Sequence, residues 1–127
     1  MHPSELRYSP EHMWLKTETD GRVRLGITYY FQDQLKNIVY IELPEVGTEV
    51  TRAEPFGSIE SSKTTSDLLS PLSGRVAEAN TSIMEKPGLI NKDPYGQGWL
   101  LIIEPGNSEE LKSLLSAKEY LALTDKQ

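Results

Sequence analysis

Lys63 is the residue whose type and surroundings point most clearly to chemistry. It stands in the segment Glu60–Gly74, ESSKTTSDLLSPLSG, where Ser62, Thr64 and Thr65 are small enough to let an enzyme close over its amine. Most lysines in loops are simply solvated. A lysine presented on a stiff scaffold is, however, suited to covalent attachment. Its ammonium becomes a neutral amide, the protein supplies position, and the attached group supplies chemistry.

Carboxylates and hydroxyls lie close to this lysine in the sequence. We expect the attachment site to be supported by Glu60, Ser62, Thr64 and Asp67. Two further acidic residues, Glu42 and Glu45, are candidates with Glu60 and Asp67 for a docking face. Solvated surface is nevertheless the ordinary role of each of these side chains.

Other reaction classes lack the residues they need. The chain has no cysteine, which excludes thiol nucleophiles, disulfides and cysteine metal sites. His2 and His12 stand apart from any cluster with metal-ligand spacing, and we expect His12 to be a packing or surface residue. No nucleophile-elbow or phosphate-binding glycine motif occurs. We therefore predict no catalytic residue and no metal site.

Size and charge narrow the class of protein further. A chain of 127 residues with 25% charged and 37% hydrophobic residues is typical of one soluble globular domain. The net charge of −6 disfavours nucleic acid and anionic membranes as partners and favours a protein with a basic rim. No apolar targeting segment or membrane-length stretch occurs, so a cytoplasmic location is expected.

Short strands and turns must position the lysine. Strands are predicted at Trp14–Glu18 and Arg22–Ile27 around the hairpin turn Asp20-Gly21. Thr28 is expected to cap a helix of about two turns that follows the hairpin. Further strands are predicted over 37–43, 56–61, 67–69, 74–79 and 99–104. The lysine therefore lies at the tip of a hairpin, and the many short strands indicate a mostly β flattened barrel or sandwich.

The segments outside these strands are less regular. Residues 80–98 are rich in Pro, Gly, Asn and Asp, and LINKDPYGQG within them predicts a turn-laden loop. A helix is predicted after Asn107, which can cap it while Glu110 completes a capping box. Its apolar stripe, which would cover the β core, is formed by Leu111, Leu114 and Leu115. We expect one domain with an arm at about 1–13, a β core at about 14–104 and this helical segment at about 107–123.

The segment ESSKTTSDLLSP, followed by SG at 73–74, resembles the lipoyl-attachment segment of glycine-cleavage H proteins, often written ESVKAASDLYSPVSG. The resemblance extends over about residues 8 to 123. The further matching segments are EHMW (11–14), GIT (26–28), IVYIELPEVGTEV (38–50), FGSIES (56–61), KPGLIN (86–91), DPYGQGWL (93–100) and LLSAKEY (114–120). Biotin carriers share the lipoyl-domain fold, but their Met-Lys-Met motif is absent here.

The resemblance implies a barrel-sandwich hybrid, the flattened barrel of two antiparallel sheets found in lipoyl domains, with short helices added. It implies lipoate bound covalently to Lys63, with a reach of roughly 14 Å if each bond adds about 1.5 Å. Such a protein is a carrier and not an enzyme. It would receive its arm from a lipoate-attaching enzyme. It would shuttle aminomethyl groups and reducing equivalents between glycine decarboxylase, aminomethyltransferase and dihydrolipoamide dehydrogenase.

Three positions depart from the family pattern. Met13 stands where the family has a glutamate credited with holding the aminomethyl group, and a thioether is a weak acceptor without charge. Tyr29 replaces an aspartate and Ser62 replaces a valine, whereas Asp67 matches the other carboxylate near the arm. Either Met13 only packs, beside Trp14, or the arm carries another cargo. The alternative is an H-like lipoate-binding protein that carries sulfur intermediates to a heterodisulfide-reductase-like complex. A protein that keeps only the fold and carries no lipoate is less favoured.

Overall fold

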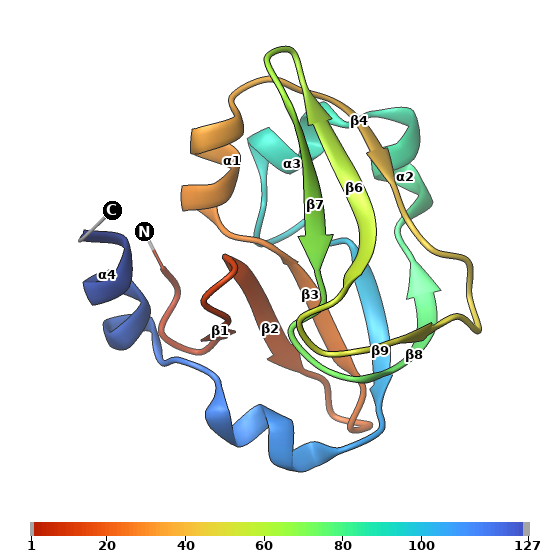
Figure 1. Cartoon of the computed structure of the whole chain (residues 1–127), viewed down its shortest axis with the longest axis vertical. Coiled ribbons are helices and arrows are strands. Elements are labelled where there is room, and N and C mark those ends of the chain that lie inside the picture. The colour runs from red at the N-terminus through yellow and green to blue at the C-terminus, as the bar shows by residue number, and fades with distance from the viewer. Residues whose placement is uncertain (1, 126–127) are drawn as a thin grey trace.

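Two antiparallel sheets form the body of the computed structural model, which describes residues 2–125 (Figure 1). The larger sheet has the order β1-β2-β3-β9-β8-β5. Its strands are β1 Arg7–Tyr8, β2 Met13–Thr17, β3 Val23–Ile27, β9 Leu101–Pro105, β8 Gly74–Ala79 and β5 Glu49–Val50. The smaller sheet has the order β4-β6-β7, formed by Ile38–Glu42, Pro55–Ser61 and Thr65–Leu69. The mostly β fold with two antiparallel sheets is confirmed.

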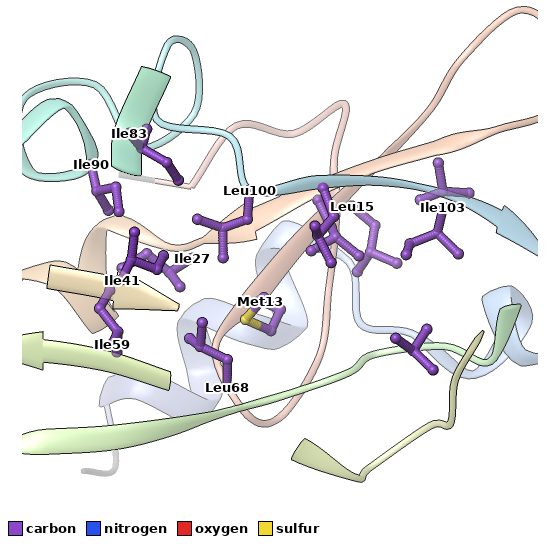
Figure 2. Close-up of a cluster of buried hydrophobic side chains, with 14 of the residues drawn as sticks. Met13, Leu15, Ile27, Ile41, Ile59, Leu68, Ile83, Ile90, Leu100 and Ile103 are labelled. Carbon is purple, nitrogen blue, oxygen red and sulfur yellow. The ribbon is translucent and has the colours of Figure 1, made fainter. Parts of the chain in front are cut away.

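The core lies between the two sheets. Inward-facing side chains alternate along the strands, as the two-residue period of a β-strand requires. Figure 2 shows side chains of both sheets pointing toward one another, and those drawn from the smaller sheet include Ile41, Ile59 and Leu68. They meet residues of the larger sheet such as Leu15, Ile27 and Ile103.

The first hairpin and the first helix form as predicted. β2 pairs with β3 from Met13↔Ile27 to Thr17↔Val23. The turn between them uses Gly21 at φ +87°, a left-handed conformation that glycine adopts without strain. Helix α1, Tyr29–Leu35, begins after Thr28, whose hydroxyl accepts a hydrogen bond from the backbone N–H of Phe31 at 3.2 Å.

The prediction of a turn-laden loop at LINKDPYGQG, residues 89–98, is only partly correct. Residues 80–98 contain two helices of five residues each, α2 Thr81–Glu85 and α3 Gly88–Lys92, and α3 takes up the start of the predicted loop. Each buries one isoleucine, Ile83 or Ile90, in the core. Helices this short carry no visible apolar period, which is why turn residues dominate the pattern. The turn at 93–96 is confirmed, and because it continues to Trp99 the last strand begins at Leu101, later than predicted.

The helical segment predicted at about 107–123 is present, but it consists of two helices and not of one. The chain forms a 3-10 helix, η1 Ser108–Ser113, and then a separate helix, α4 Ala117–Asp125. Between them Leu115 is extended, and its backbone exchanges two hydrogen bonds with Tyr8. The Asn107 cap is confirmed, because its Oδ1 accepts a hydrogen bond from the N–H of Glu109 at 3.0 Å. The Glu110 half of the capping box is wrong, because the Glu110 carboxylate accepts hydrogen bonds from the N–H and hydroxyl of Ser73, at 2.7 and 3.0 Å.

The N-terminal arm and α4 are fastened to the outer face of the larger sheet. Part of the expected arm is strand β1, and the rings of Tyr8 and Tyr120 stack at 4.8 Å. The phenol oxygen of Tyr120 lies 2.7 Å from both His12 Nδ1 and Thr28 Oγ1. Burial raises the pKa of Tyr120, so this phenol stays protonated. One side chain of α4 thus joins the start of β2 to the cap of α1.

Removing the Tyr120 hydroxyl should destabilise the fold. Tyr120→Phe deletes the group shared by His12 and Thr28, and we expect the free energy of unfolding to fall by about 1–3 kcal/mol because buried polar partners are left unpaired. Denaturant titration at pH 7.5 measures the change. The exposed Tyr40→Phe is the matched control and should stay near the wild-type value. Equal stability of the two variants would contradict the role of this contact.

Stability should also fall in mild acid through His12. Burial lowers the pKa of His12, so the folded chain binds this proton less readily than the unfolded chain. The free energy of unfolding should therefore decrease as the pH falls below about 6.5, the usual histidine value. In His12→Asn this decrease in the free energy of unfolding with falling pH should disappear. Asn also tolerates the φ of +73° at this position. Denaturant titrations at pH 7.5, 6.5 and 5.5 give the free energy of unfolding of the wild-type chain and of His12→Asn. If it falls equally with pH in both, His12 is not the cause of the decrease.

Candidate functional site

Lys63 lies at the tip of the β6–β7 hairpin, as predicted. β6 ends at Ser61 and β7 begins at Thr65, and the hairpin projects beyond the rest of the smaller sheet at the top of Figure 1. The side chain of Lys63 is exposed. In the described part of the chain, no carboxylate lies within ion-pair distance of its ammonium. The amine is therefore presented to solvent on a fixed backbone.

The buried hydroxyl of Ser61 holds the backbone on both sides of the lysine. Ser61 is 4% exposed, and its Oγ accepts hydrogen bonds from the backbone N–H of Lys63 at 3.2 Å and of Thr64 at 3.1 Å. The same hydroxyl donates to the carbonyl of Thr64 at 3.3 Å, and the Ser61 N–H donates to that carbonyl at 2.8 Å. These bonds close the tip while leaving the lysine side chain outside it.

A second set of hydrogen bonds fastens the tip to its surroundings. The N–H of Ser62 donates to the carbonyl of Asn37 at 3.0 Å. Ile38, which follows Asn37, donates its N–H to Asn91 Oδ1, while Asn91 Nδ2 donates to the carbonyl of Lys36 at 2.6 Å. The end of α1, the start of β4, helix α3 and the hairpin tip are therefore one connected unit.

Ser61 and Asn91 were missed by the sequence reasoning. Both lie in segments that carry the family resemblance, FGSIES and KPGLIN. An alternating pattern through Ile59 would have placed Ser61 on the buried face of β6. No sequence signal assigns the partner of Asn91, because its contacts are 53 or more residues away along the chain.

The predicted supporting residues separate into two groups. Ser62 and Thr64 flank the lysine at the tip and are exposed. Glu60 and Asp67 are also exposed, but they lie on the outer face of the smaller sheet, together with Glu42. Glu45 follows β4 and lies outside that sheet. The structure thus brings three of the four proposed docking carboxylates onto one face.

Met13 lies in the core. Its side chain is fully buried among apolar residues, and Figure 2 shows its sulfur above Leu68. Trp14 points to the opposite face of β2 and packs in a second buried cluster with Leu6, Tyr8 and Tyr120, so the expected packing of Met13 beside Trp14 is wrong. Successive strand residues face opposite sides, which makes such a contact impossible. The chain therefore offers a thioether, and no carboxylate, at this position.

Among residues 2–125 there is no group of three or more His, Asp or Glu that could hold a metal ion. Over the same residues no helix is long and apolar enough to cross a bilayer. His12 is half-buried and bonded to Tyr120, which agrees with the packing role expected of it.

Comparison with known proteins gives a consistent result. Residues 6–127 match the family model described as Glycine cleavage H-protein. The chain is 49% identical to the glycine cleavage system H protein of Geobacillus thermodenitrificans, over 97% of this chain and 96% of the relative. It is 48% identical to that of Oceanobacillus iheyensis, over 94% of each chain. The crystal structure of a glycine cleavage system H protein from Mycobacterium marinum superposes with a TM-score of 0.88, at 38% identity, covering 97% of this chain and 98% of that one.

Loss of the Ser61 hydroxyl should loosen the tip without unfolding the chain. In Ser61→Ala the amides of Lys63 and Thr64 lose their acceptor, and we expect their hydrogen exchange to accelerate roughly tenfold, which corresponds to about 1.4 kcal/mol. Amide exchange measured by NMR tests this. Ser62→Ala removes an exposed neighbouring hydroxyl and should leave both rates unchanged. Unchanged rates in Ser61→Ala would show that the tip is held by other contacts.

Proposed function

The chain belongs to the glycine cleavage H-protein family, and we propose that it is a single lipoyl-binding domain whose lipoate is joined by an amide to Nζ of Lys63. The observation that carries the proposal is the presentation of this amine, which is exposed and without an ion-pair partner in the described chain, on a tip that Ser61 closes. The small side chains of Ser62 and Thr64 leave the approach to the amine open.

The residues at the tip fit this attachment. An amide forms when the deprotonated Nζ attacks the activated carboxyl carbon of lipoate, a C–N bond replaces the bond to the activating group, and that group leaves with its electron pair. The fixed backbone limits the conformations that the attaching enzyme must search. Once attached, the group supplies a dithiolane that accepts an aminomethyl group and reducing equivalents. The protein's part is to hold the point of attachment.

The role that follows is a carrier within a multi-enzyme system. With a reach of roughly 14 Å from bond lengths alone, a loaded arm can enter the active sites of separate enzymes while the body stays outside. We assign those enzymes as glycine decarboxylase, aminomethyltransferase and dihydrolipoamide dehydrogenase. The names of the relatives favour this pathway over the sulfur-oxidation alternative. Met13 is then a packing residue, and Asp67 is the carboxylate left to assist an aminomethyl cargo.

Attachment should depend on Lys63 and on no other lysine. When the chain is produced with a lipoate-attaching enzyme and lipoate, we expect its intact mass to rise by one lipoyl group. Lys63→Arg keeps the positive charge but removes the nucleophile, so its mass should stay that of the bare chain. Lys92→Arg, an exposed lysine on α3, is the matched control and should be modified fully. A wild-type chain that gains no mass, or an equally modified Lys63→Arg, would contradict the proposal.

A further inference from the structure

The outer face of the smaller sheet carries an unusual combination of side chains. Two cross-strand rows define it: Tyr40–Glu60–Thr65 and Glu42–Ser58–Asp67, one residue from each of β4, β6 and β7. Directly opposed residues of neighbouring strands point to the same side of a sheet. The row between them, which contains Ile41 and Ile59, points into the core. The outer face therefore carries three carboxylates and one aromatic ring, and that ring stands on the edge strand β4.

An irregularity in β4 adds apolar surface to this face. The pairing of β4 with β6 shifts between Ile38 and Tyr40, so that Val39 and Tyr40 are both solvent-exposed, at 45% and 51%. Met84, 47% exposed, lies on α2, which packs against β4. Three of the six large exposed hydrophobic side chains in the described chain thus belong to β4 or to the helix beside it. Scattered exposed hydrophobics are ordinary, but a group of them marks an interaction surface.

The distance between this face and Lys63 favours the attaching enzyme as the protein that binds here, over the enzymes that use the loaded arm. Tyr40 is opposite Glu60, three residues before Lys63, which is about 10 Å along a strand. An enzyme that uses the loaded arm can dock roughly 14 Å from the lysine backbone, whereas a bare lysine extends only about 6 Å. The attaching enzyme meets the bare lysine, and it must therefore sit on the residues immediately around the hairpin.

Resting on the proposed function, we infer that the outer face of β4, β6 and β7 docks the enzyme that attaches lipoate. The occupant offers an apolar slot for Tyr40 and Val39, rimmed by basic side chains that face Glu42, Glu60 and Asp67. Charge complementarity supports this choice, since the two rows contain no basic residue and the whole chain carries a net charge of −6. A tyrosine next to polar and charged side chains is a common composition of a protein interface.

The experiment measures the steady-state kinetics of lipoylation of the full chain by its attaching enzyme. For Tyr40→Thr, which keeps a good strand former, and for Asp67→Lys we expect KM to rise roughly tenfold or more with little change in kcat, because docking is weakened and the lysine is intact. The matched controls are Val46→Thr and Glu104→Lys, exposed residues of the same kinds outside the outer face. They should keep the wild-type KM. Thermal unfolding of each variant verifies that it is folded.

The outcomes separate this inference from the proposed function. Wild-type KM in both Tyr40→Thr and Asp67→Lys overturns the docking inference, whereas modification of Lys63 in these variants leaves the proposed function standing. If Tyr40→Thr is attached normally but, once lipoylated, fails in glycine–bicarbonate exchange, the face serves enzymes that use the arm and the inference is again wrong. A wild-type chain that is never lipoylated overturns the proposed function itself.

Discussion

The hydrogen bonds of one buried hydroxyl determine how the lysine is presented. Ser61 closes the hairpin tip by accepting from the N–H groups on and after Lys63 and by donating to the Thr64 carbonyl. Without this acceptor, the backbone N–H groups of Lys63 and Thr64 would lose their partner within the turn. The remaining anchors, through Asn37 and Asn91, connect that closed turn to α1 and α3. The Lys63 side chain thus begins at a point whose backbone is held by hydrogen bonds.

The two faces of the smaller sheet carry different kinds of side chain. Ile41, Ile59 and Leu68 fill the core, whereas the residues between them carry charge and one exposed ring. The β4 irregularity gives the outer face two apolar residues in succession, which strict alternation would not. The proposed attachment site and the proposed docking face therefore belong to the same small sheet.

At the two ends of the chain, long-range contacts override the secondary structure that the local sequence pattern predicts. Residues with capping and apolar signals after Asn107 indicated one helix, yet Leu115 pairs with Tyr8 as an extended residue and Glu110 bonds to Ser73. Tertiary contacts provided better partners than the local capping box did. Tyr120 then connects α4 with His12 and Thr28, a contact that spans nearly the whole sequence.

By itself the sequence determined the class of fold, the hairpin with Lys63 at its tip, and the Thr28 cap, because these depend on alternation, turn residues and side chains within a few positions. Only the tertiary structure decided that Ser61 and not Ser62 supports the tip, and that Met13 faces the core. It also decided that Glu42, Glu60 and Asp67 share one face while Glu45 does not. Pairing register and long-range hydrogen bonds set these features, and no local window of sequence contains them.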